Sequence, residues 1–326
     1  MKTLRVFGLL LVLLVAGVAA GIAVGGTYLP LEDILRALSH PQERDISGVL
    51  LWEVRLPRLL MAMVIGSGLA GCGVVLQAIL RNPLAEPYTL GVSGGGALGA
   101  VIALILGLSG LPMVALCFGG CCLSMLLVLG LAALKGFSNT MLILSGVILS
   151  FLFSSVMMLV LALSSARDVH ASVMWLMGNL GASQGLDIKL MVFGVLPLLA
   201  VPAAMARDLN ILSLGDEQAG HLGMDVNWTK AALLIVAALV TGMCVAVSGI
   251  ISFIGLVIPH TMRRLVGPDH HVLVPASLIG GATLLVLSDT LAQALIRPLE
   301  LPVGVVTGIL GGVFFLGLLL RQGEVA

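Results

Sequence analysis

Charged residues are scarce in this sequence. Asp, Glu, Lys and Arg make up 10% of its 326 residues, against about 25% in an ordinary soluble domain. A water-soluble fold of this length would need far more charge to cover its surface, so the composition argues against one. Basic and acidic residues are equal in number, at 16 each, which leaves no net field to attract a nucleic acid.

Several signatures of chemistry are also missing. None of the lysines follows a glycine, so the chain has no phosphate-binding loop of the Walker type, and any ATP that drives it must bind another subunit. No His/Glu metal motif lies within an apolar run, which argues against a membrane-embedded enzyme. The cysteines lie in apolar runs without a CxxC pair, which predicts buried thiols rather than disulfides or a zinc site; they are Cys72, Cys117, Cys121, Cys122 and Cys244.

Apolar residues are abundant, at 59% of the chain, and 41 glycines allow close helix packing. Apolar runs of roughly 17 to 25 residues are long enough to cross a bilayer as α-helices. Ten apolar runs of about this length lie at about 7–28, 59–80, 90–108, 112–134, 141–164, 189–206, 229–249, 252–266, 271–295 and 302–320. The eighth is short and contains Pro259, which leaves open whether it spans fully. Together the runs predict an all-α polytopic membrane protein, with one transmembrane domain over residues 1–326. The first run follows Lys2 and Arg5 as in a signal peptide, but its length favours a retained helix.

Five of the predicted spans precede the midpoint of the chain and five follow it. Two five-helix halves would lie in the membrane in opposite orientations, an arrangement typical of transporters. An even number of spans puts both termini on one side. Lys2, Arg5 and the Arg263–Arg264 pair flank membrane ends directly, so the positive-inside rule predicts cytoplasmic termini.

The polar stretch over 209–223, LNILSLGDEQAGHLG, falls on the predicted cytoplasmic side. Acids at its start and Gly223 at its end predict a short helix over about 213–223. We expect Leu214, Ala219 and Leu222 to share one apolar face, which suits docking on another protein; a helix resting on the membrane surface is the alternative.

Two arginines begin the second span on the predicted outer side, in the sequence RLPR at 55–58. Arg55 and Arg58 are one helical turn apart, and Arg297 lies in the loop before the last span. Exposed outer arginines oppose the positive-inside bias, so an acidic partner protein would explain them; interfacial anchoring is the alternative. Asp289 is the one clear acid within a predicted span. An ion-coupled secondary transporter is expected to have more acidic residues within its spans.

Several segments together resemble the permease subunits of bacterial ABC importers for iron–siderophore complexes, haem and vitamin B12, the FecCD-like type II importers. They are RLPR at 55–58, LQAILRNPLAEP at 76–87 with LGVSG at 90–94, the 214–223 stretch, FIGLVIPH at 253–260 and ELPVGVVT at 300–307. Their order and spacing cover nearly the whole chain. The motifs are specific for the family and not for one cargo.

The resemblance implies a subunit of ten helices in the bacterial inner membrane, usually a homodimer, that is not itself an enzyme. Two ATPase subunits would bind ATP and Mg²⁺ below it, and a periplasmic binding protein would dock above it. Leu214, Gly215, Glu217, Ala219, Leu222 and Gly223 would couple to the ATPase. Asn82 and Leu84, with Asn139 and Thr140, would form a cytoplasmic gate. Arg55, Arg58 and Arg297 would receive acidic side chains of the binding protein.

The cargo expected from the resemblance is an iron(III)–siderophore, with cobalamin and haem as alternatives in the same class. The sequence departs from the family at two places. Many members have an arginine where this chain has Gln293, which leaves the role of Arg297 open. Members often have Gly-Ala-Pro in the last helix, where this chain has Gly-Gly-Val at 311–313.

Overall fold

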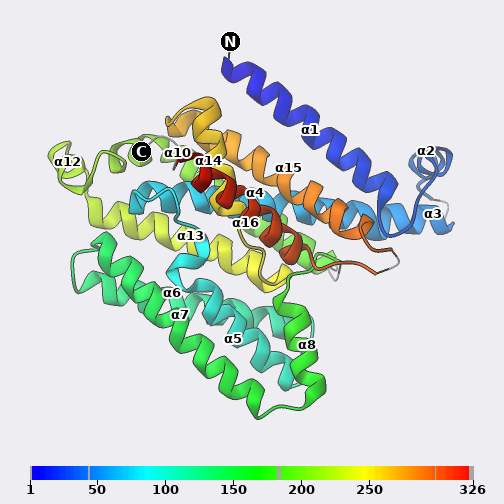
Figure 1. Ribbon diagram of the computed structural model, residues 1–326, viewed down its shortest axis with the longest axis horizontal. Helices are drawn as coiled ribbons and strands as arrows, with labels where there is room; N and C mark the ends of the chain where they lie inside the picture. The colour runs from blue at the N-terminus through cyan, green and yellow to red at the C-terminus, as the bar shows by residue number, and fades with distance from the viewer. Residues whose placement is uncertain (1, 43–44, 182–184, 298, 323–326) are drawn as a thin grey trace.

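The computed structural model describes residues 2–42, 45–181, 185–297 and 299–322, and within them the named elements are all helical (Figure 1). The prediction of an all-α protein is therefore confirmed. The helices are α1 Lys2–Val24, α2 Leu31–Ser39, α3 Ile46–Val49, η1 Leu50–Arg55, α4 Leu56–Leu80, η2 Pro87–Leu90, α5 Val92–Ile105, α6 Leu111–Ala133, α7 Asn139–Ala162, α8 Ala166–Leu176, α9 Gly185–Leu190, η3 Met191–Val195, α10 Leu196–Ala204, α11 Ala206–Leu212, α12 Asp216–His221, α13 Val226–Ser248, α14 Ile254–Val266, α15 His270–Ala294 and α16 Val303–Gln322.

Each of the ten apolar runs contains a helix, but the helices differ in length. In the described part of the chain, six are long and apolar enough to cross a membrane, and the bent pair 188–204 and 206–212 would make a seventh. Helix α5 has 14 residues and α14 has 13, fewer than the roughly 20 that a full crossing needs. The protein is thus an all-helical membrane protein with six or seven long apolar helices, and ten complete spans remain a prediction.

Helix α4 lies at the centre of the bundle. Of its most apolar window, 83% is buried inside the protein, against 22% for α7. Small residues allow this burial: Gly66 faces the backbone of Gly281 in α15, and Gly73 faces the backbone of Gly255 in α14. A side chain at either crossing would collide with main chain, so glycine sets how closely these helices approach.

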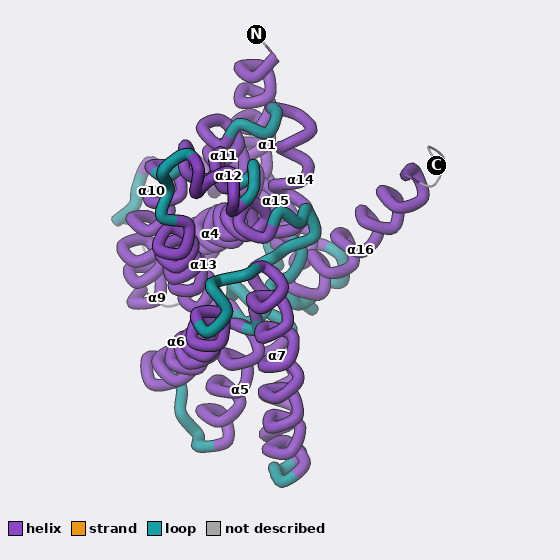
Figure 2. Tube along the Cα trace, turned by 90° about the vertical axis from the view of Figure 1, so that its left-hand side faces the viewer, coloured by secondary structure: helices purple, strands orange, loops and turns teal. Residues whose placement is uncertain are grey.

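Helices α7 and α16 lie at the margin of the bundle and extend away from it in the turned view (Figure 2). Leu144, Phe151 and Met158 on α7 are exposed, as are Ile309 and Leu316 on α16. The residues that the structure describes do not cover these side chains. Lipid or another subunit must cover them, because large exposed apolar surfaces mark contact with one or the other.

The two ends of the bundle carry its polar segments. We call the end with α2, α3 and the start of α4 the Arg58 end, and the opposite end, with α11 and α12, the α12 end (Figure 1). Helix α1 starts and α16 finishes toward the α12 end. The described parts of the two terminal helices thus agree with termini on one side.

Candidate functional sites at the two ends of the bundle

At the Arg58 end, α4 and α15 are joined by a buried ion pair. Arg58 donates from Nε to Asp289 Oδ2 at 2.9 Å and from Nη2 to Asp289 Oδ1 at 2.9 Å. This is the two-pronged geometry in which a guanidinium binds a carboxylate most strongly. The side chain of Asp289 has no exposed surface and that of Arg58 is 8% exposed, so little water screens the pair.

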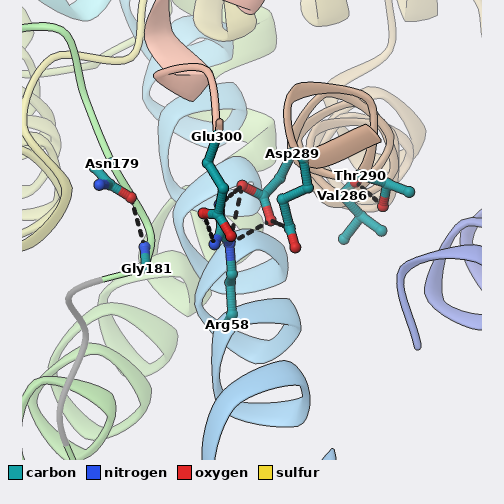
Figure 3. A network of polar contacts seen from close by, with 8 residues as sticks. Arg58, Asn179, Gly181, Val286, Asp289, Thr290 and Glu300 are labelled. Atoms are coloured by element: carbon teal, nitrogen blue, oxygen red, sulfur yellow. Dashed lines mark hydrogen bonds and ion pairs between the residues drawn. The ribbon is translucent and has the colours of Figure 1, made fainter. Parts of the chain in front are cut away.

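Two further side chains complete this network (Figure 3). Arg58 Nη1 donates to Glu300 Oε2 at 2.6 Å, from the segment that precedes α16. Gln293, one turn beyond Asp289 on α15, donates from Nε2 to Asp289 Oδ2 at 2.8 Å. The amide that stands where many family members have an arginine therefore supports the same carboxylate. Every charge in the cluster has a partner of opposite sign.

The prediction that Arg55 and Arg58 are exposed is wrong, because they are 5% and 7% exposed. Arg55 donates to the carbonyl of Ile22 near the end of α1 and to the carbonyl of Thr27 in the loop after it. The guanidinium thus caps the end of this helix. Hydropathy places both arginines at a membrane end, but it does not reveal the carboxylates and carbonyls that α15 and α1 bring to them. Arg297 is exposed and donates to the carbonyl of Val24.

A cavity of about 260 Å³ lies beside this network, lined among others by Thr27, Arg55, Arg58, Gln293 and Glu300. Asp289, the acid that an ion-coupled transporter would need free, is occupied by Arg58 and Gln293. The cluster therefore joins α4, α15 and the segment before α16.

At the α12 end, the short helix predicted over 213–223 is present as Asp216–His221. Glycines with left-handed φ flank it, Gly215 at 119° and Gly223 at 85°, a conformation that residues with a Cβ adopt only with strain. Leu214 and Leu222 are 56% and 63% exposed, and Glu217 is also exposed.

Ala219 does not share the exposed face of this helix. It is fully buried, since α12 rests on the bundle through this side chain, so the prediction that it lies beside Leu214 and Leu222 on a docking face is wrong. In this short helix the side chain of Ala219 faces the bundle, whereas Leu214 and Leu222, just outside its two ends, are exposed. These two leucines, which flank α12 on either side, are therefore the exposed apolar side chains of this segment.

The predicted gate residues follow α4 and begin α7. Asn82 Oδ1 accepts from the Leu84 backbone N–H at 2.9 Å, and Leu84 is 54% exposed. Asn139 is the first residue of α7 and Thr140 is exposed. Gly91, which follows the same loop after α4, lies against the carbonyl of Gly146 in α7, so this loop and α7 are in contact beyond the predicted gate residues.

Lys230 on α13 is a residue of this end that the sequence analysis did not single out. Its side chain has no exposed surface, and its Nζ donates to Asp216 Oδ2 at 2.6 Å and Asn139 Oδ1 at 2.8 Å. The ammonium thus joins α12 to α7. A lysine five residues into a span, with an acid fourteen positions earlier, is the signal that could have found it.

Two loops meet in the interior between these ends. The Phe253 backbone N–H donates to Glu86 Oε2 at 3.3 Å, and Tyr88 Oη donates to the Ile251 carbonyl at 2.9 Å. Burial raises the pKa of Glu86, and the hydrogen bond from Phe253 opposes that rise. The loops 81–91 and 249–253 are therefore held against each other by polar contacts.

A cavity of about 600 Å³ opens beside α12, lined among others by Gln77, Arg81, Leu214, Arg263 and Asp269. The Asn210 amide lowers the pKa of Asp269 by donating to its carboxylate at 2.8 Å, with help from the His271 backbone N–H. Asp269 thereby stays ionised as the cap of α15. No cluster of three or more His, Cys, Asp or Glu in the described residues is placed to hold a metal ion.

Comparison with known proteins finds relatives of one family that match nearly the whole length of the chain. The sequence profile of the FecCD transport family matches residues 10–321. The chain is 36% identical to the hemin transport system permease of Yersinia pestis over 97% of this chain and 96% of that protein. It is 36% identical to the vitamin B12 import system permease of Klebsiella pneumoniae, covering 97% and 93%. It is 42% identical to the Fe(3+) dicitrate transport system permease FecD of Escherichia coli, covering 83% and 85%.

A solved structure shares the fold. It is described as a metal-chelate type ABC transporter in an inward-facing conformation. The two chains superpose with a TM-score of 0.88 at 32% identity, over 98% of this chain and 99% of the other. The helix arrangement described above is thus the arrangement of that transporter subunit.

Proposed function

The chain belongs to the FecCD transport family, and from this membership we infer that it carries an iron(III)–siderophore complex as the permease of an ATP-driven importer. It is a multi-pass permease subunit and not itself an enzyme. The observation that carries the proposal is the family match over residues 10–321, on a chain without a nucleotide-binding loop and with polar sites at both ends.

The energy for transport comes from partner subunits. An ABC importer permease works with an ATPase, which binds ATP and Mg²⁺, and with a binding protein that delivers cargo. We place two ATPase subunits at the α12 end, because Leu214, Glu217 and Leu222 project there from a helix that Ala219 anchors. This orientation makes the α12 end cytoplasmic and puts both termini in the cytoplasm, in the bacterial inner membrane.

We place the binding protein at the Arg58 end. Arg297 is exposed there, so its guanidinium can be reached by an acidic side chain of the binding protein. Arg55 and Arg58 support this surface from beneath, by fixing the end of α1, α15 and Glu300. The gate formed by Asn82, Leu84, Asn139 and Thr140 would close the opposite end of the pathway.

The subunit would act as a homodimer with the pathway between its two copies. The marginal helices α7 and α16 support this, because the described residues do not cover their exposed apolar side chains (Figure 2). Walls of small and apolar residues suit a bulky chelate, since the binding protein supplies the affinity. Lipid covers the remaining apolar surface, and nucleic acid has no part in the function.

Two inverted halves are supported by a pair of matching segments. In the first half a helix of 25 residues, α4, leads through an irregular loop to the 14-residue α5. In the second half a helix of 23 residues, α13, leads through another loop to the 13-residue α14. Short segments at corresponding positions are typical of repeated transporter halves, and these loops contact each other.

Haem and cobalamin are the alternative cargoes, because the Yersinia pestis and Klebsiella pneumoniae relatives are named for hemin and vitamin B12 transport. The test is to load the cognate binding protein with each of ferric siderophore, haemin and cobalamin, and to measure which it retains. Retention of ferric siderophore alone supports the proposal. Retention of cobalamin or haemin alone would reassign the cargo within the same class.

Docking of the ATPase is tested by replacing both Leu214 and Leu222 with Asp, with exposed Leu134 on the neighbouring loop replaced by Asp as the control. We expect the double variant to lose the ATPase on co-purification while the control retains it. A double variant that assembles normally would show that α12 is not the docking element.

A further inference from the structure

Lys230 lies where the proposed coupling and gate elements meet. Its ammonium group donates to Asp216 Oδ2 on α12 at 2.6 Å, to Asn139 Oδ1 on α7 at 2.8 Å and to the Phe137 carbonyl at 3.4 Å. A lysine ammonium has three N–H donors, and here they meet three acceptors from two segments, Asp216 on α12 and the pair Phe137 and Asn139 at the start of α7. Because the side chain has no exposed surface, water does not replace an acceptor that moves away.

Residues with left-handed φ flank the elements that carry the acceptors. Helix α12 lies between Gly215 and Gly223, both with left-handed φ, and glycines at element ends are common hinge positions. On the other side, Gly136 and Phe137 also have left-handed φ, at 63° and 54°. That backbone aims the Phe137 carbonyl at the ammonium immediately before α7 begins at Asn139.

We propose that Lys230 transmits the movement of α12 to the start of α7, so that the ATPase and the gate at Asn139 and Thr140 move together. This inference rests on the proposed function. When α12 shifts, Asp216 moves with it, and the buried ammonium must either follow or lose the ionic partner that it has among the described residues. If the ammonium follows, it draws Asn139 with it, because a buried charge without acceptors is strongly unfavourable.

A lysine suits this position better than an apolar side chain would. Its flexible four-carbon stem and compact charge can follow a moving carboxylate while keeping the other two acceptors. The Asp216 side chain is 38% exposed, although its Oδ1 is buried and has no hydrogen-bond partner among the described residues. Loss of Lys230 removes the ionic link between α12 and α7, and the exposed part of the Asp216 carboxylate stays in contact with water.

The experiment uses the complete importer, with its ATPase and binding protein, in proteoliposomes. Cargo uptake and phosphate release are measured together, with radiolabelled ferric siderophore as the probe, or haemin or cobalamin if the wild type transports one of these. The readout is cargo transported per ATP hydrolysed. Lys135→Met is the matched control, because Lys135 is an exposed lysine just before the same turn.

We expect Lys230→Met to lower the transport ratio about five- to tenfold, with Lys230→Arg restoring part of the loss and Lys135→Met unchanged. Asp216→Asn should lower the ratio comparably, and the double variant should lose no more than Lys230→Met, because both remove one link. A ratio within twofold of wild type for Lys230→Met would overturn the inference. If Lys230→Met does not assemble, Asp216→Asn decides by the same criterion. Absence of ATP-driven uptake by the wild type would instead refute the proposed function.

Discussion

Replacing Asp289 by Asn tests the buried ion pair that joins α4 to α15. The substitution keeps the shape of the side chain and an oxygen for Gln293, but it removes the charge opposite Arg58. An arginine does not lose its proton in a protein, so its charge stays buried at 8% side-chain exposure. Breaking a buried pair by removing one partner costs roughly 3–5 kcal/mol. Glu300 still accepts from Arg58 at 2.6 Å, so we expect about 3 kcal/mol, the lower end of that range.

Glu300→Gln is the matched control for this substitution. It removes the other carboxylate of the same network, but the Glu300 side chain is 44% exposed, and water compensates for an exposed pair. We therefore expect a loss below about 1 kcal/mol. The double variant Arg58→Met with Asp289→Leu removes both buried charges and should recover most of the stability, since apolar replacements of buried pairs are often tolerated.

The assay is unfolding of the purified chain in mixed micelles as the fraction of denaturing detergent rises, followed by circular dichroism. The reasoning predicts the order of stability wild type, Glu300→Gln, then Asp289→Asn, with the double apolar variant above Asp289→Asn. If Asp289→Asn is as stable as Glu300→Gln, the buried pair does not hold α4 and α15 together in the way described.

Two further predictions concern the interior loops and the helix crossings. Burial raises the pKa of Glu86 above its usual 4.5, so the folded state binds the proton more readily than the unfolded state. The stability of the protein should therefore fall as pH rises through the folded pKa. Melting curves of Glu86→Gln should lack this pH-dependent loss of stability, and identical pH slopes for the variant and the wild type would contradict the prediction. Gly73→Ala should destabilise the chain by about 1–3 kcal/mol or more, because its Cβ would collide with the Gly255 carbonyl. Gly119→Ala, with nothing within 4 Å of its Cβ, should be neutral, and equal losses in a thermal melt would refute the close crossing.

The helices were predictable because hydrophobicity and run length are local properties. The amphipathic stretch 31–38 forms α2, and the short helix before Gly223 is present with its glycine cap in left-handed φ. The length of α5 was overestimated, since apolar residues on either side of the helix continue its hydrophobic run, whereas the short eighth run at 252–266 closely predicted α14 at Ile254–Val266. Where α5 begins depends on packing between loops that are distant in sequence.

The arrangement of charges was the less predictable part. Arg58 and Asp289 are 231 positions apart, and one sequence without relatives gives no signal for that contact, so Arg58 reads as an exposed cation at a membrane end. Ala219 was assigned to the exposed face because helical periodicity does not say which face of a short helix rests on the protein. Lys230 was not singled out, because hydropathy alone does not show that three acceptors surround it.

Transport by the reconstituted complex tests the central claim most directly. The chain is placed in proteoliposomes with its ATPase, the binding protein is added outside with radiolabelled ferric siderophore, and accumulation inside is measured with ATP, with a non-hydrolysable analogue, and with an imposed ion gradient alone. The proposed function predicts accumulation only when ATP, the ATPase and the binding protein are all present. Accumulation driven by the ion gradient without the ATPase would contradict it.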